Sequence, residues 1–308
     1  MSVAVSQPFP KDSPVVPFLN AIAGSLVNVA PEKGAAIQEE LVKLKVRLVV
    51  DQSTDSLFKA RLRDGRPDIC CSVYGAEVLW AAAFGYIAVH RRLKEFGGST
   101  IVFAEIDCTA HLPELLSFAF DRRYGQQDER PWPVQLPRPE AYESPQEIND
   151  VNLSTELWLC AVAWILHHEV THVRLGHLQK GDYELRDEVA ADEGATNWLL
   201  EGVTDPGIAL KRSLGIAIAV VANAAFALHR NIRGSIGSRT HPPAGERILR
   251  AMSHTSLADD HQAQELAAVA VKIHLDRFEM AAPLGPFANS SDCLNAYCGT
   301  LTTWELRR

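Results

Sequence analysis

Apolar and charged residues alternate most clearly between Leu41 and Asp51. The apolar positions are Val42, Leu44, Val46 and Leu48, and the cations between them are Lys43, Lys45 and Arg47. A period of two places the apolar side chains on one face of an extended chain. The pattern therefore predicts a half-buried strand over 41–51. Shorter runs predict a weaker strand over 68–72 and another over 101–106.

Two helices are expected in the same half of the chain. Residues 75–96 are apolar nearly all round and end in cations, followed by Gly97 and Gly98. Cations suit the last turn of a helix and glycine ends it. A second helix is expected over 111–120.

Residues 1–18 read as a loose tail punctuated by proline. Five prolines between 131 and 145 predict an irregular connection, or alternatively a segment lying over an active site.

Beyond Asn152 the pattern becomes helical. The expected helices span 154–178, 183–201, 206–230, 242–252 and 261–280. The sequence therefore predicts an α+β fold that is mostly α. Its expected parts are an N-terminal α/β region over 1–150, of unassigned role and ending in the proline-rich connection, and a helical core over 151–308.

One apolar stretch, 214–228, resembles a membrane segment. It spans 15 residues and contains Asn223, whereas a spanning helix needs roughly 20 apolar residues. A buried core helix is the better interpretation. The N-terminus lacks the basic start and apolar centre of a signal peptide, so a cytoplasmic protein without a membrane partner is expected.

The charge balance and cysteines narrow the function classes. The formal net charge is −8 and no strong basic run occurs, so a nucleic-acid partner is not favoured. The six cysteines form no CxxC pair. They are interpreted as reduced thiols, with a disulfide between Cys293 and Cys298 as the alternative.

The candidate chemistry lies in the expected helix 154–178, which contains His168-Glu169-Val-Thr-His172. Histidines four apart share one face of a helix and can bind one Zn²⁺. Glu169 is offset around the helix, where it can act as general base on a water molecule beside the metal. The alternative is a chance pattern of histidines that satisfy each other. The apolar run 157–166 argues against it, because buried polar groups need a partner.

A third metal ligand is expected from the next helix. Glu188 and Asp192 are four apart and can both face the first helix. Glu188 would bind zinc, and Asp192 would accept the free ring N–H of a ligand histidine. The alternative is a solvated acidic face. His177 and His167 are weaker candidates for the third ligand.

The spacing of the residues after His172 excludes the metzincin class of zinc enzymes. The metzincin pattern HExxHxxGxxH requires glycine at 175 and histidine at 178. This chain has Leu175 and Leu178 at those positions.

These motifs carry a resemblance to a known family. His168-Glu169-x-x-His172 followed by Glu188-x-x-Ala191-Asp192 resembles the gluzincin peptidases, particularly the HtpX and CAAX-prenyl-protease group. The run Ser238 to Ile248, with His241-Pro242-Pro243 and Arg247, is similar to a downstream element of that group. The resemblance covers roughly residues 155–252. Because that group is usually embedded in membranes, the soluble phage-exclusion peptidases are a closer parallel.

The resemblance implies a zinc metallopeptidase, of endopeptidase type, with a zincin-like core and a protein or peptide substrate. It implies that His241 and Arg247 support the metal site or the oxyanion. Without it, His241-Pro242-Pro243 reads as an ordinary helix start. Two other functions stay open: a latent effector protease of phage-defence type, and a zincin-fold binding or regulatory module with non-catalytic zinc. The oligomeric state is left open.

Overall fold

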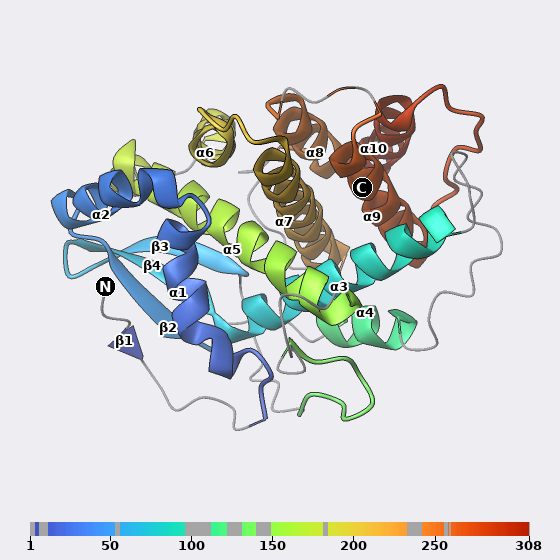
Figure 1. The fold of residues 1–308 in the computed structure, drawn as a ribbon. Coiled ribbons are helices and arrows are strands. Elements are labelled where there is room, and N and C mark those ends of the chain that lie inside the picture. The colour runs from blue at the N-terminus through green and yellow to red at the C-terminus, as the bar shows by residue number, and fades with distance from the viewer. Residues whose placement is uncertain are drawn as a thin grey trace.

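The protein is mostly helical, with one small sheet at one end (Figure 1), which confirms the predicted α+β class. The computed structural model describes residues 4–5, 12–52, 56–95, 112–121, 131–139, 149–180, 184–232, 242–255, 258 and 260–307. Side chains are described within these ranges except at 4–5 and 230–232. The predicted strand 101–106 and His241 lie outside the described residues.

The sheet and two covering helices form the N-terminal end. The helices are α1 (Leu19–Asn28) and α2 (Gly34–Lys43), each preceded by a 3-10 turn, η1 (Val16–Phe18) and η2 (Pro31–Lys33). The strands are β1 (Ala4–Val5), β2 (Arg47–Asp51), β3 (Phe58–Arg63) and β4 (Arg66–Ser72). Their order is β1-β2-β4-β3, with β1–β2 and β2–β4 parallel and β3–β4 antiparallel. Within the described sheet, β3 is therefore an edge strand.

The predicted strand over 41–51 is wrong in its first half. Residues 41–43 are the last turn of α2, and Val42 is 79% exposed. The chain then turns at Lys45, whose φ is 55°, before the strand starts at Arg47. The alternation combined a helix end with a strand start. Such a short pattern cannot separate the two.

The sequence interpretation missed β3 and found β4. Asp64 and Gly65, with φ of 52° and 72°, connect the two strands. Two residues with positive φ suit a tight hairpin turn, and Asp-Gly is a strong signal for one. That dipeptide was the signal that could have identified β3.

The other helices are α3 (Val73–Glu95), α4 (Leu112–Phe120), α5 (Asp150–Arg174), α6 (Leu185–Leu200), α7 (Pro206–Ile232), α8 (Ala244–Ser253), α9 (Gln262–Arg277) and α10 (Ser290–Leu306). Helix α5 begins earlier than predicted, because the Asn149 side chain caps it by accepting the Asn152 N–H. It ends earlier because Gly176 adopts φ 71° before the 3-10 turn η5 (His177–Gln179). Helix α10 was not predicted.

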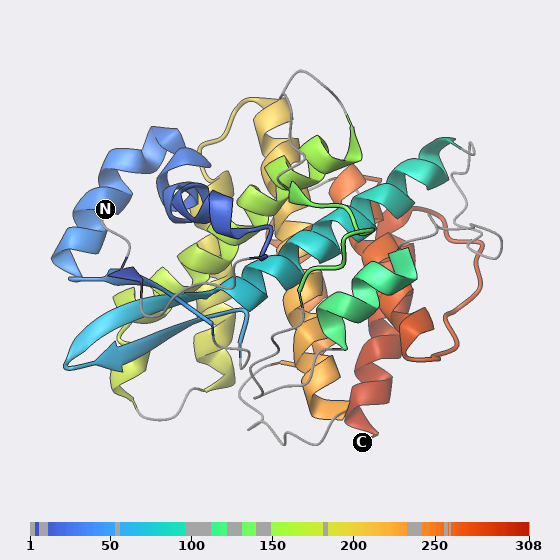
Figure 2. The same ribbon diagram turned by 90° about the horizontal axis from the view of Figure 1, so that it is seen from below.

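Helix α5 is the central element of the molecule. It runs between the sheet and helices α8–α10, as Figures 1 and 2 show from two directions. It packs against α1, α3, α6 and α7, and Trp158 and Trp164 along it are fully buried. A Cβ at Gly215 of α7 would lie 2.3 Å from the Cβ of Cys160. Glycine there permits the close crossing of α7 over α5.

Two described helices, α3 and α7, are long and apolar enough to cross a membrane by length and composition alone. In α3, 89% of the most apolar 18-residue window is buried inside the structure, and in α7 the buried share of that window is 67%. Since buried core helices pass the same test, the finding is weak evidence for a span. Helix α7 agrees with the helix predicted over 206–230 and extends beyond the 15-residue apolar stretch within it.

Helix α3, which precedes residue 150, packs against α5, α7 and α9 of the C-terminal region. The division of the chain into two regions at residue 150 stays a prediction.

Cys293 and Cys298 are both buried and free, so the alternative of a disulfide between them is wrong.

Candidate metal centre

Helix α5 buries three polar side chains in its C-terminal half. His168, Glu169 and His172 are 4%, 9% and 2% exposed. The apolar residues of the run 157–166 pack into the core. Because the helix continues without a break, the turns that follow this run are buried as well. The polar groups are therefore held inside the protein rather than at its surface.

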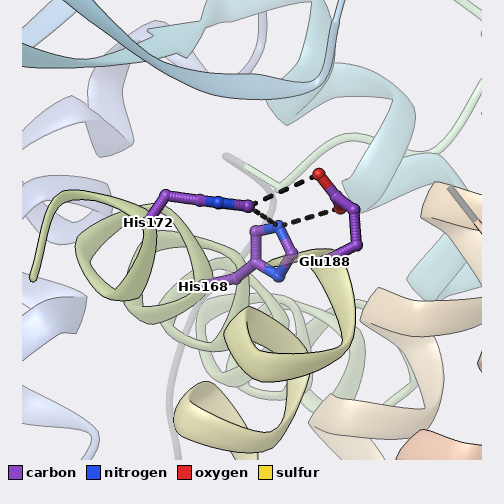
Figure 3. Close-up of side chains that lie close together, drawn as sticks. All are labelled: His168, His172 and Glu188. Atoms are coloured by element: carbon purple, nitrogen blue, oxygen red, sulfur yellow. Dashed lines mark hydrogen bonds and ion pairs between the residues drawn. The ribbon is translucent and has the colours of Figure 1, made fainter. Parts of the chain in front are cut away.

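Helix α6 brings Glu188 to the two histidines, as Figure 3 shows. The Nε2 atoms of His168 and His172 lie 3.0 Å apart. The Glu188 oxygens lie 3.6 Å from the His168 Nε2 and 3.5 Å from the His172 Nε2. One potential ligand atom of each residue lies within 4.8 Å of the others, which makes this a group that could hold a metal ion.

Small residues allow α6 to approach α5 at this point. Ala191 is fully buried, and a Cβ at Gly194 would meet the Thr171 side chain at 2.8 Å. Glycine and alanine remove the bulk that would otherwise separate the helix axes.

Behind His168 lies a buried carboxylate with its own cation. The His168 Nδ1 is 2.8 Å from Asp192 Oδ1. Arg247, on α8, donates two hydrogen bonds to Asp192, from Nε and Nη2, both 2.8 Å long. Its Nη2 is also 3.9 Å from Glu188 Oε2. The structure thus brings Asp192 and Arg247 to the cluster, where the Arg247 guanidinium contacts the carboxylates of Asp192 and Glu188.

Glu169 points toward the sheet. Its Oε2 accepts the backbone N–H of Ala60, on β3, at 2.5 Å. The edge strand therefore borders the cluster, which the sequence interpretation had not anticipated.

A third histidine, His177, lies behind His172. Their Nδ1 atoms are 2.9 Å apart. The weak candidate His177 thus contacts a candidate ligand from the side away from Glu188. His167 faces elsewhere: its Nε2 is 3.1 Å from the carbonyl oxygen of Leu26, and burial lowers its pKa to about 3.

The pKa values follow from burial and charge. Burial raises the pKa of Glu169, because it disfavours the ionised carboxylate. Burial alone would lower the pKa of His168, but Asp192 and nearby carboxylates outweigh it and raise that pKa. Burial would raise the pKa of Asp192, yet Arg247 and His168 hold it well below its usual range. Burial, helped by neighbouring histidines, lowers the pKa of His172.

Comparison with known proteins shows what the chain is similar to. A sequence model of the family described as Peptidase U49 matches residues 69–267. The chain is 29% identical over 269 residues to the "Cell death peptidase" of Escherichia coli (strain K12), which covers 83% of this chain and 87% of that protein. No solved structure matches significantly. The family match includes all the described candidate residues of the cluster.

Proposed function

This chain belongs to the Peptidase U49 family, and we propose that it is a zinc-dependent peptidase of gluzincin type whose metal is held by His168, His172 and Glu188. The observation that carries the proposal is the convergence of these three buried side chains from two helices. Two imidazoles and one carboxylate are a donor set typical of catalytic zinc.

The spacing of the donors fits a tetrahedral ion. Donors that lie 2.0–2.1 Å from such an ion are about 3.4 Å apart. The nitrogen–nitrogen distance between His168 and His172 is 3.0 Å, and their distances to the Glu188 oxygens are 3.6 and 3.5 Å. Small adjustments of side chains would therefore suffice for binding.

The protonation of His168 also fits. An ionised carboxylate can only accept hydrogen bonds, and Asp192 lies 2.8 Å from the His168 Nδ1. That nitrogen therefore carries the proton. In the neutral ring, the Nε2 that faces His172 and Glu188 then keeps its lone pair for a metal.

Zinc, when bound, supplies Lewis-acid activation of a carbonyl and of a water molecule. The chain supplies the proton transfers. Glu169 takes a proton from the attacking water and delivers it to the leaving amine. Burial raises the pKa of Glu169, and a raised pKa suits a carboxylate that must accept and return a proton near neutral pH.

Arg247 and His241 are assigned supporting roles. Arg247 holds Asp192 with two hydrogen bonds, and thereby orients His168. Its contact with the carboxylates favours support of the metal site over contact with the oxyanion. The role of His241 rests on the resemblance alone.

The substrate class is protein or peptide, as the family indicates. Endopeptidase action and a cytoplasmic location stay predictions. A second candidate function is a latent protease that waits for a trigger. It is favoured by the burial of Glu169, which is 9% exposed, and by its hydrogen bond from the Ala60 N–H. The name of the Escherichia coli relative, a cell death peptidase, is compatible with controlled activity.

The test is Glu169→Gln against a matched control, Glu156→Gln, on the same helix. Glu156 forms a largely exposed ion pair with Lys211. We expect both variants to retain zinc. Glu169→Gln should lose cleavage by about 10²- to 10⁴-fold, the usual contribution of a general base. The readout is a comparison of lysate peptides before and after exposure to zinc-loaded protein.

Each outcome separates the candidate functions. Full cleavage by Glu169→Gln would refute the role of that carboxylate. Cleavage by the parent protein that requires a cellular trigger would favour the latent protease. Bound zinc with no cleavage under any condition would favour a binding or regulatory module.

A further inference from the structure

His172 has a polar partner of its own, on the side away from Glu188. Its Nδ1 lies 2.9 Å from the Nδ1 of His177, with the ring planes at 70°. His177 is 5% exposed, so water does not compete freely for this contact. Two ring nitrogens at hydrogen-bond distance need one proton between them. The next partner in the chain decides which ring carries it.

That partner is a carboxylate. The Nε2 of His177 lies 3.3 Å from Asp187 Oδ1. Since the carboxylate can only accept, the His177 Nε2 carries a proton, and in the neutral ring its Nδ1 has the lone pair. The shared proton therefore sits on His172 Nδ1, which donates to His177. The Nε2 of His172 is left with its lone pair directed toward His168 and Glu188.

Asp187 is itself fixed in place. Lys180 Nζ lies 2.8 Å from its Oδ1, and its Oδ2 accepts the backbone N–H of Glu184 at 3.1 Å. The second contact is one half of the capping box that starts α6. The start of α6 thus serves two purposes, because the same helix also carries Glu188.

The backbone places His177 where it can serve this purpose. Helix α5 ends at Arg174, and Gly176 adopts φ 71°, in the left-handed region where glycine is favoured. The chain then reverses into η5 and presents His177 to the ring five residues earlier. A chain that continued as an α-helix would direct position 177 about 140° around the axis from position 172.

We propose that His177 is a positioning residue, which with Asp187 and Lys180 fixes the tautomer and orientation of His172 for metal binding. The proposal rests on the proposed function, since it takes His172 as a zinc ligand. It gives each ligand histidine its own support: Asp192 with Arg247 behind His168, and His177 with Asp187 and Lys180 behind His172. Removing such a partner typically costs 10- to 100-fold in metal affinity.

The first test compares three substitutions of His177. The amide of asparagine replaces the ring Nδ1, so His177→Asn keeps an acceptor for His172. The amide of glutamine instead replaces the Nε2 and leaves that position empty. We expect His177→Leu and His177→Gln to weaken zinc binding 10- to 100-fold and His177→Asn to retain affinity within about threefold of the parent protein. Zinc affinity is measured by competition with a chromophoric chelator.

The second test reads the tautomer in the zinc-loaded parent protein. Two-dimensional ¹⁵N–¹H spectra of the imidazole rings should show His172 protonated at Nδ1 and His177 protonated at Nε2. The electronic absorption of the cobalt-loaded protein should change in His177→Leu and stay the same in His177→Asn. His254→Leu, at an exposed position where the ring lies 3.1 Å from Glu193, controls for the loss of a histidine outside the cluster.

Several results would overturn the proposal. One is unchanged affinity and cobalt spectrum in His177→Leu; another is a proton on the Nδ1 of His177. A metal-bound chemical shift at His177 would make it a ligand instead. The proposed function fails in a different way, if the parent protein binds no zinc or if Glu169→Gln cleaves fully. The two failures are therefore distinguishable.

Discussion

Within the part of the chain that the structure describes, two groups of histidines are buried between helices, and one of them forms a cluster that could hold a metal ion. The carboxylate-bound cluster (His168, His172, His177, Glu188 and Asp192) lies between α5 and α6. The aromatic cluster (Tyr86, Phe120, His229, His274 and Phe278) lies where α3, α4, α7 and α9 meet. The central histidines of both clusters are buried, since His168, His172 and His274 are all below 5% exposed. Burial and histidine content therefore do not distinguish them.

The neighbours of the rings make the difference. In the carboxylate-bound cluster the Nε2 atoms of His168 and His172 face each other at 3.0 Å, beside Glu188. In the aromatic cluster the rings of His229 and His274 are 6.1 Å apart between centroids, and the His274 Nε2 lies 2.5 Å from the Tyr86 hydroxyl. A metal site needs converging lone pairs and anionic partners behind them; packing against aromatic rings provides neither.

Electrostatics follow the same division. Carboxylates raise the pKa of His168 despite its burial, whereas burial lowers the pKa of His274 well below its usual value, aided by His229 and Arg277. The carboxylate near the aromatic cluster, Asp121, lies at its edge, 3.9 Å from His229 and paired with Arg277. The surroundings of His274 in the aromatic cluster thus favour a neutral ring.

The largest expected difference between the clusters is in metal content. His172→Gln should reduce bound zinc from about one ion per chain to a small fraction after gel filtration, because an amide is a poor zinc donor. His274→Gln, the matched change in the aromatic cluster, should retain the full amount. Elemental analysis of the two purified proteins makes the measurement. Equal zinc in both would mean that the metal lies elsewhere.

Removing the cation behind the ligands should cost the most stability. Arg247→Met leaves Asp192 as a buried charge without its guanidinium, a change that typically destabilises by about 3–5 kcal/mol. Urea unfolding of zinc-loaded protein measures the loss. The double variant Arg247→Met with Asp192→Asn should recover part of it, because it removes the uncompensated charge. An Arg247→Met protein as stable as the parent would show that the ion pair does not support the cluster.

The two clusters also differ in how far the sequence could predict them. The spacing of the candidate site residues lies within single helices, since His168 and His172 are four apart, as are Glu188 and Asp192, and helix periodicity brings each pair to one face. The structure brings these four residues into one buried cluster. The aromatic cluster joins residues from four helices, such as Tyr86 and His274. No local pattern reports such distant contacts.

The same reasoning explains which contacts the sequence interpretation missed near the carboxylate-bound cluster. His177 contacts His172 only because Gly176 breaks the helix, and the helical pattern had been extended past that point to 178. Ala60 reaches Glu169 because the hairpin at Asp64-Gly65 presents β3 to α5. Both contacts thus depend on short turns, at Gly176 and at Asp64-Gly65, and the periodicity of helices and strands does not predict such turns.

A smaller effect should follow from a change in the aromatic cluster. Tyr86→Phe removes the hydroxyl that faces His274 and leaves the Nε2 of that ring buried without a partner. The expected cost is about 1–3 kcal/mol in unfolding free energy, with zinc content unchanged. Urea unfolding and elemental analysis of the same sample make the measurement. A loss of zinc in Tyr86→Phe would contradict the separation of the two clusters.

The smallest expected effect is a change in how stability depends on pH. Burial lowers the pKa of His274 in the folded protein, while the unfolded chain has the ordinary value of about 6.5. As pH falls below about 6.5, the unfolded chain takes up a proton that the folded protein excludes, so stability decreases. One such group contributes at most about 1.4 kcal/mol per pH unit.

His274→Gln should therefore flatten the decline between about pH 6.5 and pH 5 relative to the parent protein. His254→Gln, at an exposed position, serves as the matched control for replacing a histidine with glutamine. Unfolding free energies from urea titrations at several pH values give the slopes. The histidines of the carboxylate-bound cluster are present in all three proteins, so their contribution cancels in the differences between slopes. Parallel declines for the parent protein and His274→Gln would mean that His274 takes up its proton in the folded state, and that the aromatic cluster does not hold this ring neutral.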